Sequence, residues 1–559
     1  MWFNTLRNTR RPIAAVSPRL RLEALEGRCL LSAGQLDPTF GSGGVVTTPI
    51  SSGDMALQPD GKVLAGGGPF QMTRYTPAGT LDTTFGNGGN VTTTIAGWSL
   101  QHASAMALYP ATGTANDGKI VMTGNTSVST GKKTSETQLA LVRYNANGSL
   151  DTTFGTGGAV TNGFGNATYD LGEAVVVQPD GKILVAGRSG GYANPTPIVL
   201  ARYNANGTPD LSFGSGGSVI SLPGGTTVCD ARAVALQPDG RIVVGGFLYL
   251  GGDNLFAVVR YTANGTLDTT FGQGGFAAVS VFAGGATSFG AFDVAVQPDG
   301  RVVAAGRGRT TFPGTPSALT LVLARFTAAG SLDTSFAGTG IVSQNPLGPG
   351  AYDSANGVAL QPDGKIVGGG LHAVIATNQQ SFMLLRYNPD GGLDTTFNGT
   401  GIVLTSSFKN TIDGSGTVAI QPADGKIVVR GTTVSGSFVV LARYLGDPPP
   451  QAASVAPLAA KQVQPILQEA SVRYTPDGSL GSSLTAGGSR SVTGLSGGYG
   501  NDIAIRQADG TVNPGEARPG AVALGSPEGT SSFLDDLFAA RLDLSWAAIA
   551  QFLEEKDRS

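Results

Sequence analysis

The sequence predicts an all-β fold, a β-propeller with seven four-stranded blades. The first observation is that three short phrases recur in fixed order, each seven times, at a spacing of about sixty residues. They are QPDGK/R, with two variant copies, YPATGTANDGK and QPADGK; an Arg followed by Tyr or Phe; and LDxxF, with one copy written PDLSF. The second observation is abundant glycine, 85 residues in 559, roughly twice the usual share of about 7%. Glycine among Val, Ile, Thr and Phe indicates short strands joined by tight turns.

Each repeat unit reads as four strands. Runs such as AVALQ and KIVVAG are joined by Pro-Asp-Gly, which favours a tight hairpin. LALVRYN follows as a third strand, then a turn such as NANGS, and then a fourth strand from LDTTFG into GGxVxT. Strands that are apolar throughout must be covered on both faces, and four-stranded units satisfy one another by stacking around an axis. A linear solenoid is the alternative, but its end units would look capped rather than interrupted.

The first repeat, LDPTFGSGG at 36–44, is interrupted because it lacks the Arg that precedes every other copy by eight residues. That offset pairs Arg with Asp across a hairpin, and these pairs should be solvent-exposed, each contributing at most about 1 kcal/mol. Asp37 and Arg443 are left without partners. We therefore expect the N-terminal strand to complete the last blade and to bring Asp37 beside Arg443, which removes two sheet edges. The six complete pairs are Arg74–Asp82, Arg143–Asp151, Arg202–Asp210, Arg260–Asp268, Arg325–Asp333 and Arg386–Asp394.

QPDGKIVVAG followed by LARYNANGSLDTTFG resembles the delta-60 repeat of bacterial propeller proteins, whose rhythm is related to that of NHL-type blades. The resemblance covers 36–446. It implies a propeller fold, often in exported or surface proteins, and no common enzymatic activity.

The two ends of the chain differ from the repeats. Residues 1–35 are basic and contain Leu25-Glu-Gly-Arg-Cys-Leu-Leu-Ser32, which resembles a motif near the N-termini of bacterial exported proteins, so we expect an exported, extracellular or cell-surface protein. Residues 447–530, rich in Pro, Ala, Gly and Ser, read as a mostly disordered linker. Residues 531–559 have the apolar spacing of one amphipathic helix, which would dock on the propeller or on a partner.

Composition argues against several classes of function. The balance of 36 basic and 39 acidic side chains gives no basic excess for nucleic acid. Two Cys and two His offer little for a disulfide framework, a metal centre or a catalytic triad, and no apolar run has the length of a membrane span. The Asp of LDxxF is copied into every unit, whereas catalysis needs one centre with distinct environments. We expect no catalytic residue, no metal and no cofactor.

Loop lengths favour one face of the propeller as the binding face. The QPDG and NANG turns are short, whereas the connections on the opposite face are long and differ between units, as at 125–138, 188–197, 247–255 and 307–320. Variable loops on a rigid scaffold commonly carry binding. The expected contact residues are Lys132, Lys133, Arg188, Tyr192, Tyr249, Arg307, Arg309, Phe312 and His372. Just before the innermost strands, the axial opening would be rimmed by Glu173, Arg232, Asp293 and Asn356.

The leading functional hypothesis is a non-catalytic binding or structural scaffold that recognises a protein or glycan through this face. The alternative is a lyase- or hydrolase-type enzyme with a site in the central channel. Propellers host both kinds of function, so the fold alone does not choose between them.

Overall fold

The computed structural model describes residues 32–447 together with 491–493 and 504–506. Within 32–447 the gaps are 52, 132–133, 165–168, 191–195, 227, 251–252, 281–287, 311–317, 345–346, 348–350, 375, 378, 407–411 and 434–437. The chain divides into two compact units, Met1–Ala453 and Ser454–Ser559. In the second unit, β29 (Ser491–Thr493) pairs antiparallel with β30 (Ala504–Arg506). The predicted export-type motif, the rest of the predicted linker and the predicted C-terminal helix lie outside the described residues.

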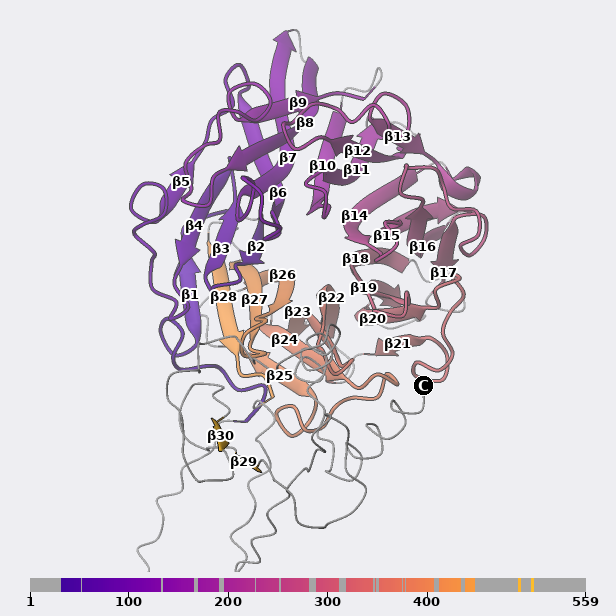
Figure 1. Cartoon of the computed structure of the whole chain (residues 1–559). Coiled ribbons are helices and arrows are strands. Elements are labelled where there is room, and N and C mark those ends of the chain that lie inside the picture. Colours follow the sequence, from indigo (N-terminus) through magenta and orange to yellow (C-terminus); the bar gives the residue numbers. More distant parts are fainter. Residues whose placement is uncertain are drawn as a thin grey trace, which may run out of the picture. The chain divides into compact units, whose positions relative to one another are not determined.

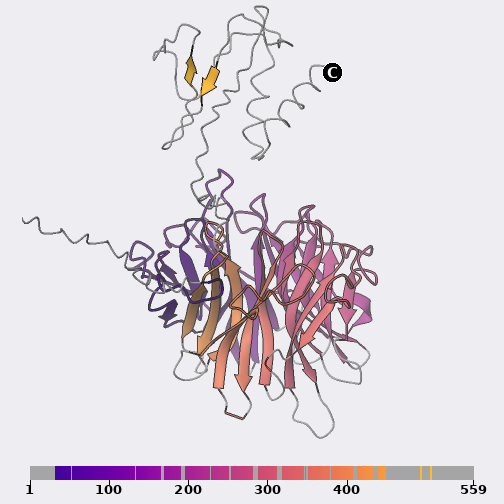
Figure 2. The ribbon, with the colours of Figure 1, turned by 90° about the horizontal axis from the view of Figure 1, so that it is seen from below.

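The first unit is an all-β, propeller-like fold built from groups of four antiparallel strands arranged around a central axis (Figure 1). Two neighbouring groups are joined into an eight-stranded sheet by a parallel pairing of Tyr169 in β10 with Thr137 in β8. Seen at right angles to that view, the strands run along the direction of the axis (Figure 2). In each group the first strand lies nearest the axis, and we call these the inner strands. The inner strands are β2 (Gly53–Leu57), β6 (Leu100–Leu108), β10 (Tyr169–Val177), β14 (Val228–Leu236), β18 (Ser288–Val296), β22 (Ala351–Leu360) and β26 (Ile412–Ile420).

The other strands follow outward in chain order in nearly every group. The second strands are β3 (Val63–Gly67), β7 (Ile120–Gly131), β11 (Ile183–Gly190), β15 (Ile242–Leu250), β19 (Val302–Thr310), β23 (Ile366–Val374) and β27 (Ile427–Thr433). The third strands are β4 (Gln71–Tyr75), β8 (Thr134–Tyr144), β12 (Ile198–Tyr203), β16 (Asp253–Tyr261), β20 (Ala318–Phe326), β24 (Gln379–Tyr387) and β28 (Val439–Tyr444). The outermost strands are β5 (Asn90–Thr92), β9 (Ala159–Asn162), β13 (Ser218–Ser221), β17 (Phe276–Val279), β21 (Ile341–Gln344), β25 (Ile402–Thr405) and, beside β28, β1 (Val45–Thr48).

The exception to chain order is β1, which comes from the N-terminus and pairs antiparallel with β28 near the end of the repeats, with Val45 opposite Ala442. The backbone N–H of Asp37 donates to the carbonyl of Arg443 at 2.8 Å, and the N–H of Arg443 donates to Gly44 at 2.9 Å. The predicted pairing of the first half-repeat with the last is therefore present.

The hydrophobic core lies between neighbouring sheets. One cluster combines Leu184 and Leu200 of one group with Val244 and Tyr261 of the next, all of them at most 1% exposed. This placement follows from strands that are apolar on both faces, because each sheet must be covered on both sides.

The predicted short turns form as expected. Gly240 in the Pro-Asp-Gly turn between β14 and β15 has a φ of 83°, a left-handed conformation that favours glycine. The GTGG segment behaves similarly: Gly158 has a φ of 100°, and a Cβ there would lie 2.6 Å from the side chain of Leu150. These glycines serve the backbone, as predicted for the GxGG segments.

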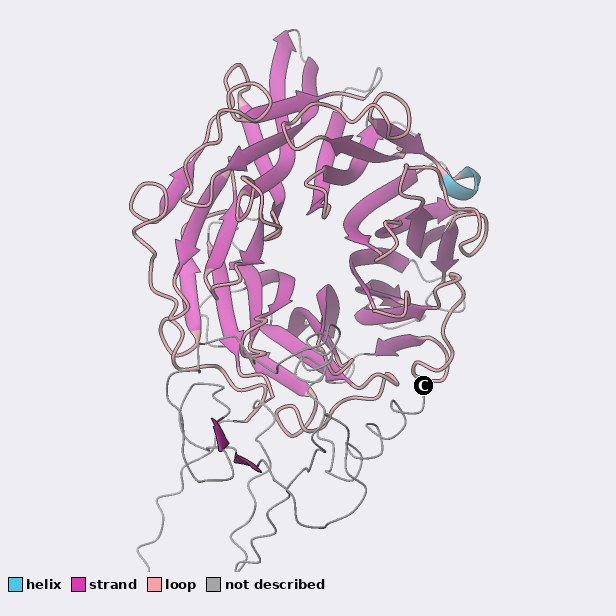
Figure 3. Ribbon diagram, viewed as in Figure 1, coloured by secondary structure: helices cyan, strands magenta, loops and turns pink. Residues whose placement is uncertain are grey.

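Strands supply nearly all of the regular structure, together with one short 3-10 helix, η1 (Pro223–Gly225) (Figure 3). The described part of the chain contains no helix with the length and apolar character needed to cross a bilayer. The long connections that the sequence predicts as loops are partly strand: β7 and β8 extend toward each other across 125–138, and β15 and β16 do so across 247–255. Alternating Thr, Ser, Tyr and Leu residues continue the ladder there, because β-branched and aromatic residues fit a pleated strand.

Candidate functional site

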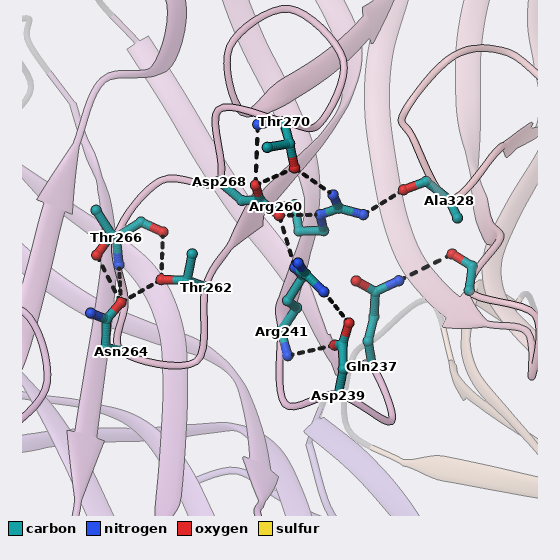
Figure 4. A network of polar contacts seen from close by, with 11 residues as sticks. Gln237, Asp239, Arg241, Arg260, Thr262, Asn264, Thr266, Asp268, Thr270 and Ala328 are labelled. Carbon is teal, nitrogen blue, oxygen red and sulfur yellow. Dashed lines mark hydrogen bonds and ion pairs between the residues drawn. The ribbon is translucent and has the colours of Figure 1, made fainter.

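A repeated polar network surrounds the Arg that stands next to last in each third strand, and the copy at Arg260 shows its geometry (Figure 4). Arg260 Nε donates to Asp268 Oδ2 at 2.8 Å, and the guanidinium lies 4.5 Å from the centre of the Phe271 ring. Asp268 Oδ1 accepts from the hydroxyl of Thr270 at 2.6 Å and from its backbone N–H at 3.1 Å. Arg260 NH1 donates to the carbonyl of Ala328 in the next strand group at 2.5 Å. The network thus joins two neighbouring sheets.

The described residues contain seven copies of this Arg–Asp ion pair, including Arg443 with Asp37 at 2.9 Å. The pairs are confirmed, but their predicted exposure is wrong, because the paired side chains are only 0 to 9% exposed. The neighbouring sheet and the Phe ring cover them. Burial alone would raise the pKa of Asp37, yet the bonds from Thr39 and the charge of Arg443 lower it to about 2. These carboxylates are held as structural anions.

Arg386 is the exception in this set. Its NH1 and NH2 groups donate to the two carboxylate oxygens of Asp447, both at 2.9 Å, instead of to a turn carbonyl. In the last strand group the fourth strand comes from the N-terminus, so no third-to-fourth turn is present there. Asp447, just after β28, supplies the acceptors that this turn gives elsewhere.

The turn aspartates also have a structural role, as predicted. Asp239 Oδ1 accepts the backbone N–H of Arg241 at 3.0 Å and its carboxylate pairs with the Arg241 side chain (Figure 4). Among the described residues, no group of three His, Cys, Asp or Glu side chains is placed to hold a metal ion.

Polar residues without counterparts in the other groups gather on the inner strands. The predicted rim residues lie within these strands rather than before them. Glu173, Arg232 and Asn356 each occupy the extra residue of a β-bulge, and Asp293 directly follows one. A bulge leaves one residue unpaired in the ladder and redirects its side chain. The inner strands thereby present different side chains at matching positions.

Three predicted residues share a buried carboxylate that the sequence analysis did not select. Arg232 NH2 lies 2.5 Å from Asp230 Oδ2, and Arg188 NH1 lies 3.8 Å from the same oxygen. Asp230 is 1% exposed, whereas the side chains of Arg188 and Arg232 are 30% and 36% exposed. Burial raises the pKa of Glu173, which feels the charges of Arg232, Asp230 and Arg188. We call these four residues the Arg–Asp clamp.

Asp293 and Asp54 occupy matching positions, each three residues before the end of its inner strand. Asp293 accepts the backbone N–H groups of Val294 and, on the next inner strand, Val358, both at 2.8 Å. Burial raises the pKa of Asp293 to about 7, and the nearby charge of Asp54 acts in the same direction. Each side chain keeps some solvent exposure although protein atoms surround it.

Asp54 in turn joins three inner strands. It accepts the N–H of Met106 at 3.0 Å and the hydroxyl of Thr417, in addition to the N–H of Met55 at 2.8 Å. Burial raises its pKa, and these hydrogen bonds together with the charge of Arg430 oppose that rise. The sequence analysis missed Asp54, although an acid in GDMALQPDG departs from the AVALQPDG pattern.

Arg430 is a second departure that the sequence analysis missed. It stands in KIVVRG where the matching residues of the other second strands are Gly66, Thr123, Ala186, Gly245, Ala305 and Gly369. Its side chain is buried, and its Nε and NH2 atoms have no hydrogen-bond partner. Its NH1 atom lies 2.6 Å from where a Cβ on Gly416 would be, so the absence of a side chain at 416 makes room for it. Burial lowers the pKa of Arg430 to about 10.

The remaining expected contact residues are dispersed. His372 is buried in β23, where its Nδ1 lies 2.7 Å from Oδ1 of the buried Asp353. Tyr249 is exposed in β15, and the Arg307 guanidinium lies 5.0 Å from the ring centre of Phe292. Arg309 lies in β19, and its side chain is outside the described set. Also outside the described residues are Lys132, Lys133, Tyr192 and Phe312.

His102 and Cys229 also lie among the described residues. His102 is exposed in β6, and Cys229 is fully buried with its Sγ 3.0 Å from the Thr226 hydroxyl. Burial raises the pKa of the Cys229 thiol to about 11, which keeps it protonated and unreactive.

No curated protein matches the chain. Similar solved structures include the Swd1 β-propeller of Myceliophteria thermophila, 7% identical over 71% of this chain and 97% of that one, with a TM-score of 0.36. The polysaccharide lyase Uly1 is 13% identical over 76% and 95%, with a TM-score of 0.41. The α-L-arabinofuranosidase Arb93A of Fusarium graminearum is 8% identical over 62% and 93%, with a TM-score of 0.35.

One family model matches, a beta-propeller domain of unknown function, DUF5122. Its matches recur along the repeats, at residues 58–85, 115–154, 178–213, 237–271, 297–336 and 361–397. Each match begins in a QPDG-type turn and ends at the Phe of LDxxF or PDLSF, so it spans the second strand and the third strand with its network Arg. The chain is a β-propeller repeat protein.

Proposed function

We propose that this protein is a non-catalytic binding scaffold, exported or at the cell surface, that recognises a protein or glycan through the axial end of a closed, seven-bladed propeller. One observation carries the proposal. The polar residues that recur in each repeat form hydrogen bonds and ion pairs that join neighbouring sheets, whereas polar residues that depart from the repeat lie on the inner strands.

Contacts between successive groups support closure and the count of seven. Each inner strand contacts the next around the axis, and the last of them, β26, contacts the first, β2. At this seam Arg443 NH1 donates to the carbonyl of Pro77, and Gln421 Nε2 donates to Gly61 at 3.2 Å. Arg260 and Gln237 make the same two contacts with the group that follows theirs. The seam thus repeats the geometry of an internal interface.

Available surface supports a site at the axial end. The clamp arginines keep about a third of their side-chain surface exposed, whereas the network arginines keep less than a tenth. A guanidinium with free N–H groups is well suited to polar ligands. Residues Leu25–Ser32 carry the proposal of export by their resemblance to the motif of exported proteins.

The test is to probe glycan and protein arrays with the full chain and with the Arg188→Gln/Arg232→Gln variant. The matched control is Arg301→Gln, which removes an exposed guanidinium from a turn on the opposite face. The proposal expects specific binding by the wild type and by the control, and weaker binding by the clamp variant. Failure of the wild type to bind any array component above background would count against it.

A second candidate function is an enzyme of the lyase or hydrolase type acting at the axis, and the raised pKa of Asp293 favours it. A carboxyl group with a pKa of about 7 is matched to proton transfer near neutral pH. Screening the wild type against polysaccharides for reducing ends or unsaturated products tests this candidate. Product formation that Asp293→Asn abolishes would replace the scaffold proposal, while its absence across the screen would leave the scaffold in place.

A further inference from the structure

The Arg–Asp clamp has the construction of a site for an oxyanion. Asp230 is 1% exposed and its Oδ2 faces both guanidinium groups. A buried carboxylate fixes the orientation of the arginines that neutralise it, because separating them would leave an uncompensated charge. The two guanidinium groups come from different strand groups, Arg188 from β11 and Arg232 from β14. Asp230 therefore positions two cations side by side at a boundary between sheets.

Among the described inner strands whose register can be compared, the pairing of Asp230 with Arg232 occurs once. At the position of Asp230, the other inner strands whose register defines it carry His102, Leu171, Gly290 and Ser354. At the bulge position of Arg232 they carry Ser104, Glu173, Phe292 and Asn356. Asp230 and Arg232 thus do not belong to the repeat, whereas Arg188 has a counterpart in Arg307, which lies opposite Gly290 and has no acid there.

The charges leave donors available for a ligand. Arg232 uses NH2 on Asp230, while Arg188 is held more loosely at 3.8 Å. The Nε atoms of both residues and both oxygens of Asp230 are buried and make no hydrogen bond, so a ligand would contact the part of each arginine side chain that is exposed. The charges of both arginines act to lower the pKa of Glu173, but among the described residues no ion pair within 4.0 Å joins Glu173 to either of them. Two positive charges and one fully buried negative charge give a local excess of positive charge whenever Glu173 is protonated.

We infer that Arg188 and Arg232, oriented by Asp230, bind an oxyanion group of the ligand, either a carboxylate or a sulfate. The inference rests on the proposed binding function and deepens it by naming the chemistry that the site recognises. A guanidinium presents parallel N–H groups that match the oxygens of either anion. Partial exposure of both arginines gives a ligand access, and burial of Asp230 keeps the clamp assembled in its absence.

The experiment is isothermal titration calorimetry on the full chain with three probes: glucuronate, inorganic sulfate and glucose. Glucose has the shape of glucuronate without its charge. The wild type should bind at least one anion, with affinity falling as salt is raised, and should give no signal with glucose. The glucuronate and sulfate titrations distinguish the two sources of the oxyanion. Binding to neither anion, or equal binding of glucose and glucuronate, would overturn the inference.

Three variants separate recognition from folding. Arg232→Gln should weaken anion binding by about tenfold or more, as loss of a charge-assisted hydrogen bond does. The double variant Asp230→Asn/Arg232→Gln removes both charges and so avoids a buried unpaired carboxylate, and it should show the same loss. Arg301→Gln, whose side chain is 42% exposed beside Asp299, should bind as the wild type does. Equal losses in the Arg301 and Arg232 variants would mean that the signal is non-specific.

The inference and the proposed function can fail separately. If the arrays identify a ligand whose binding is unaffected by Arg188→Gln/Arg232→Gln, the scaffold function stands and the oxyanion clamp is wrong. If neither the arrays nor the titrations show binding, the scaffold function and the oxyanion clamp are both wrong.

Discussion

Aspartate occurs both in the repeated Arg–Asp network and on the inner strands, but its pKa is shifted in opposite directions in the two places. In the repeated network, Asp394 accepts bonds from Thr396 and faces Arg386 and Lys365, and these contacts overcome its burial and lower its pKa to about 2. On the inner strands, burial dominates and raises the pKa of Asp293 to about 7. Asp394 is held ionised by the cations beside it. No cation contributes to the pKa of Asp293, so its carboxyl group stays partly protonated near pH 7.

This difference indicates how residues that join the sheets of a propeller can be told apart from residues that would contact a ligand. A residue that must join each sheet to the next is needed in every group, so it recurs and is fully engaged. A residue that contacts a ligand on the axis is needed once, so it appears as a departure from the repeat. Asp54, Asp230 and Arg430 depart from the repeat, and each lies on a first or second strand of its group.

Removing the N-terminal strand should have the largest effect. Deleting residues 36–50 removes β1, Asp37 and the Phe40 ring beneath Arg443. We expect the last group, β26 to β28, to lose protection first, with a loss of more than about 5 kcal/mol in its local opening free energy, because a buried ion pair and a sheet edge are exposed together. Hydrogen exchange measures this. Unchanged exchange in 412–444 would contradict closure by the N-terminal strand.

Breaking one Arg–Asp pair of the network should have the next largest effect on stability. Arg260→Ala leaves Asp268 without its buried partner and removes the link to Ala328. We expect the free energy of unfolding to fall by about 3 kcal/mol, as for other buried pairs that lose one member. Arg241→Ala is the matched control, because Arg241 contacts the same Asp268 at 3.0 Å but is 41% exposed, and it should cost less than about 1 kcal/mol. Urea denaturation compares them, and equal losses would mean that burial does not distinguish the two arginines.

The sequence predicted the repeated part of the molecule well because repetition supplies many copies of one signal. An eight-residue offset between Arg and Asp located each hairpin, and the missing copy correctly placed Asp37 beside Arg443. Burial of the pairs was not predicted, because it arises from the neighbouring sheet, which a single hairpin does not reveal.

The inner positions were predicted less completely. Arg188 was selected from a long connection, and Glu173 and Arg232 from their places just before the innermost strands, but Asp230 was not selected. Arg232 lies on the same strand as Asp230, whereas Arg188 comes from the adjacent group, and a contact across sheets is not readable from spacing within one repeat. Arg430 was visible as a departure in KIVVRG, yet only the register shows that it replaces a small residue packed against the next sheet.

Asp293→Asn should produce a smaller effect that depends on pH. The pKa of Asp293 is higher in the folded protein, about 7, than the ordinary value of 3.8, so the folded state binds the proton more tightly. Its stabilising contribution is therefore complete below about pH 4 and is lost as pH rises through 7. Relative to the variant, the wild type should lose about 2 kcal/mol between pH 5 and pH 8. Urea unfolding at both values tests this, and parallel pH profiles would show that Asp293 keeps an ordinary pKa.

Arg430→Ala should have the smallest effect and the opposite sign. Alanine already stands at this position in β11 and β19, as Ala186 and Ala305, so the backbone accepts it. Arg430 keeps a charge in a buried place where its Nε and NH2 atoms have no partner and the charge of Asp54 offsets the burial only in part, so removing it relieves a desolvation cost. We expect the free energy of unfolding to rise by about 1 kcal/mol, measured by urea denaturation. Arg443→Ala, which removes a paired arginine from the next strand of the same group, should instead lower it. A loss of stability in both variants would mean that Arg430 is the required counter-charge of Asp54. Arg430 would then stabilise the fold, as the network arginines do.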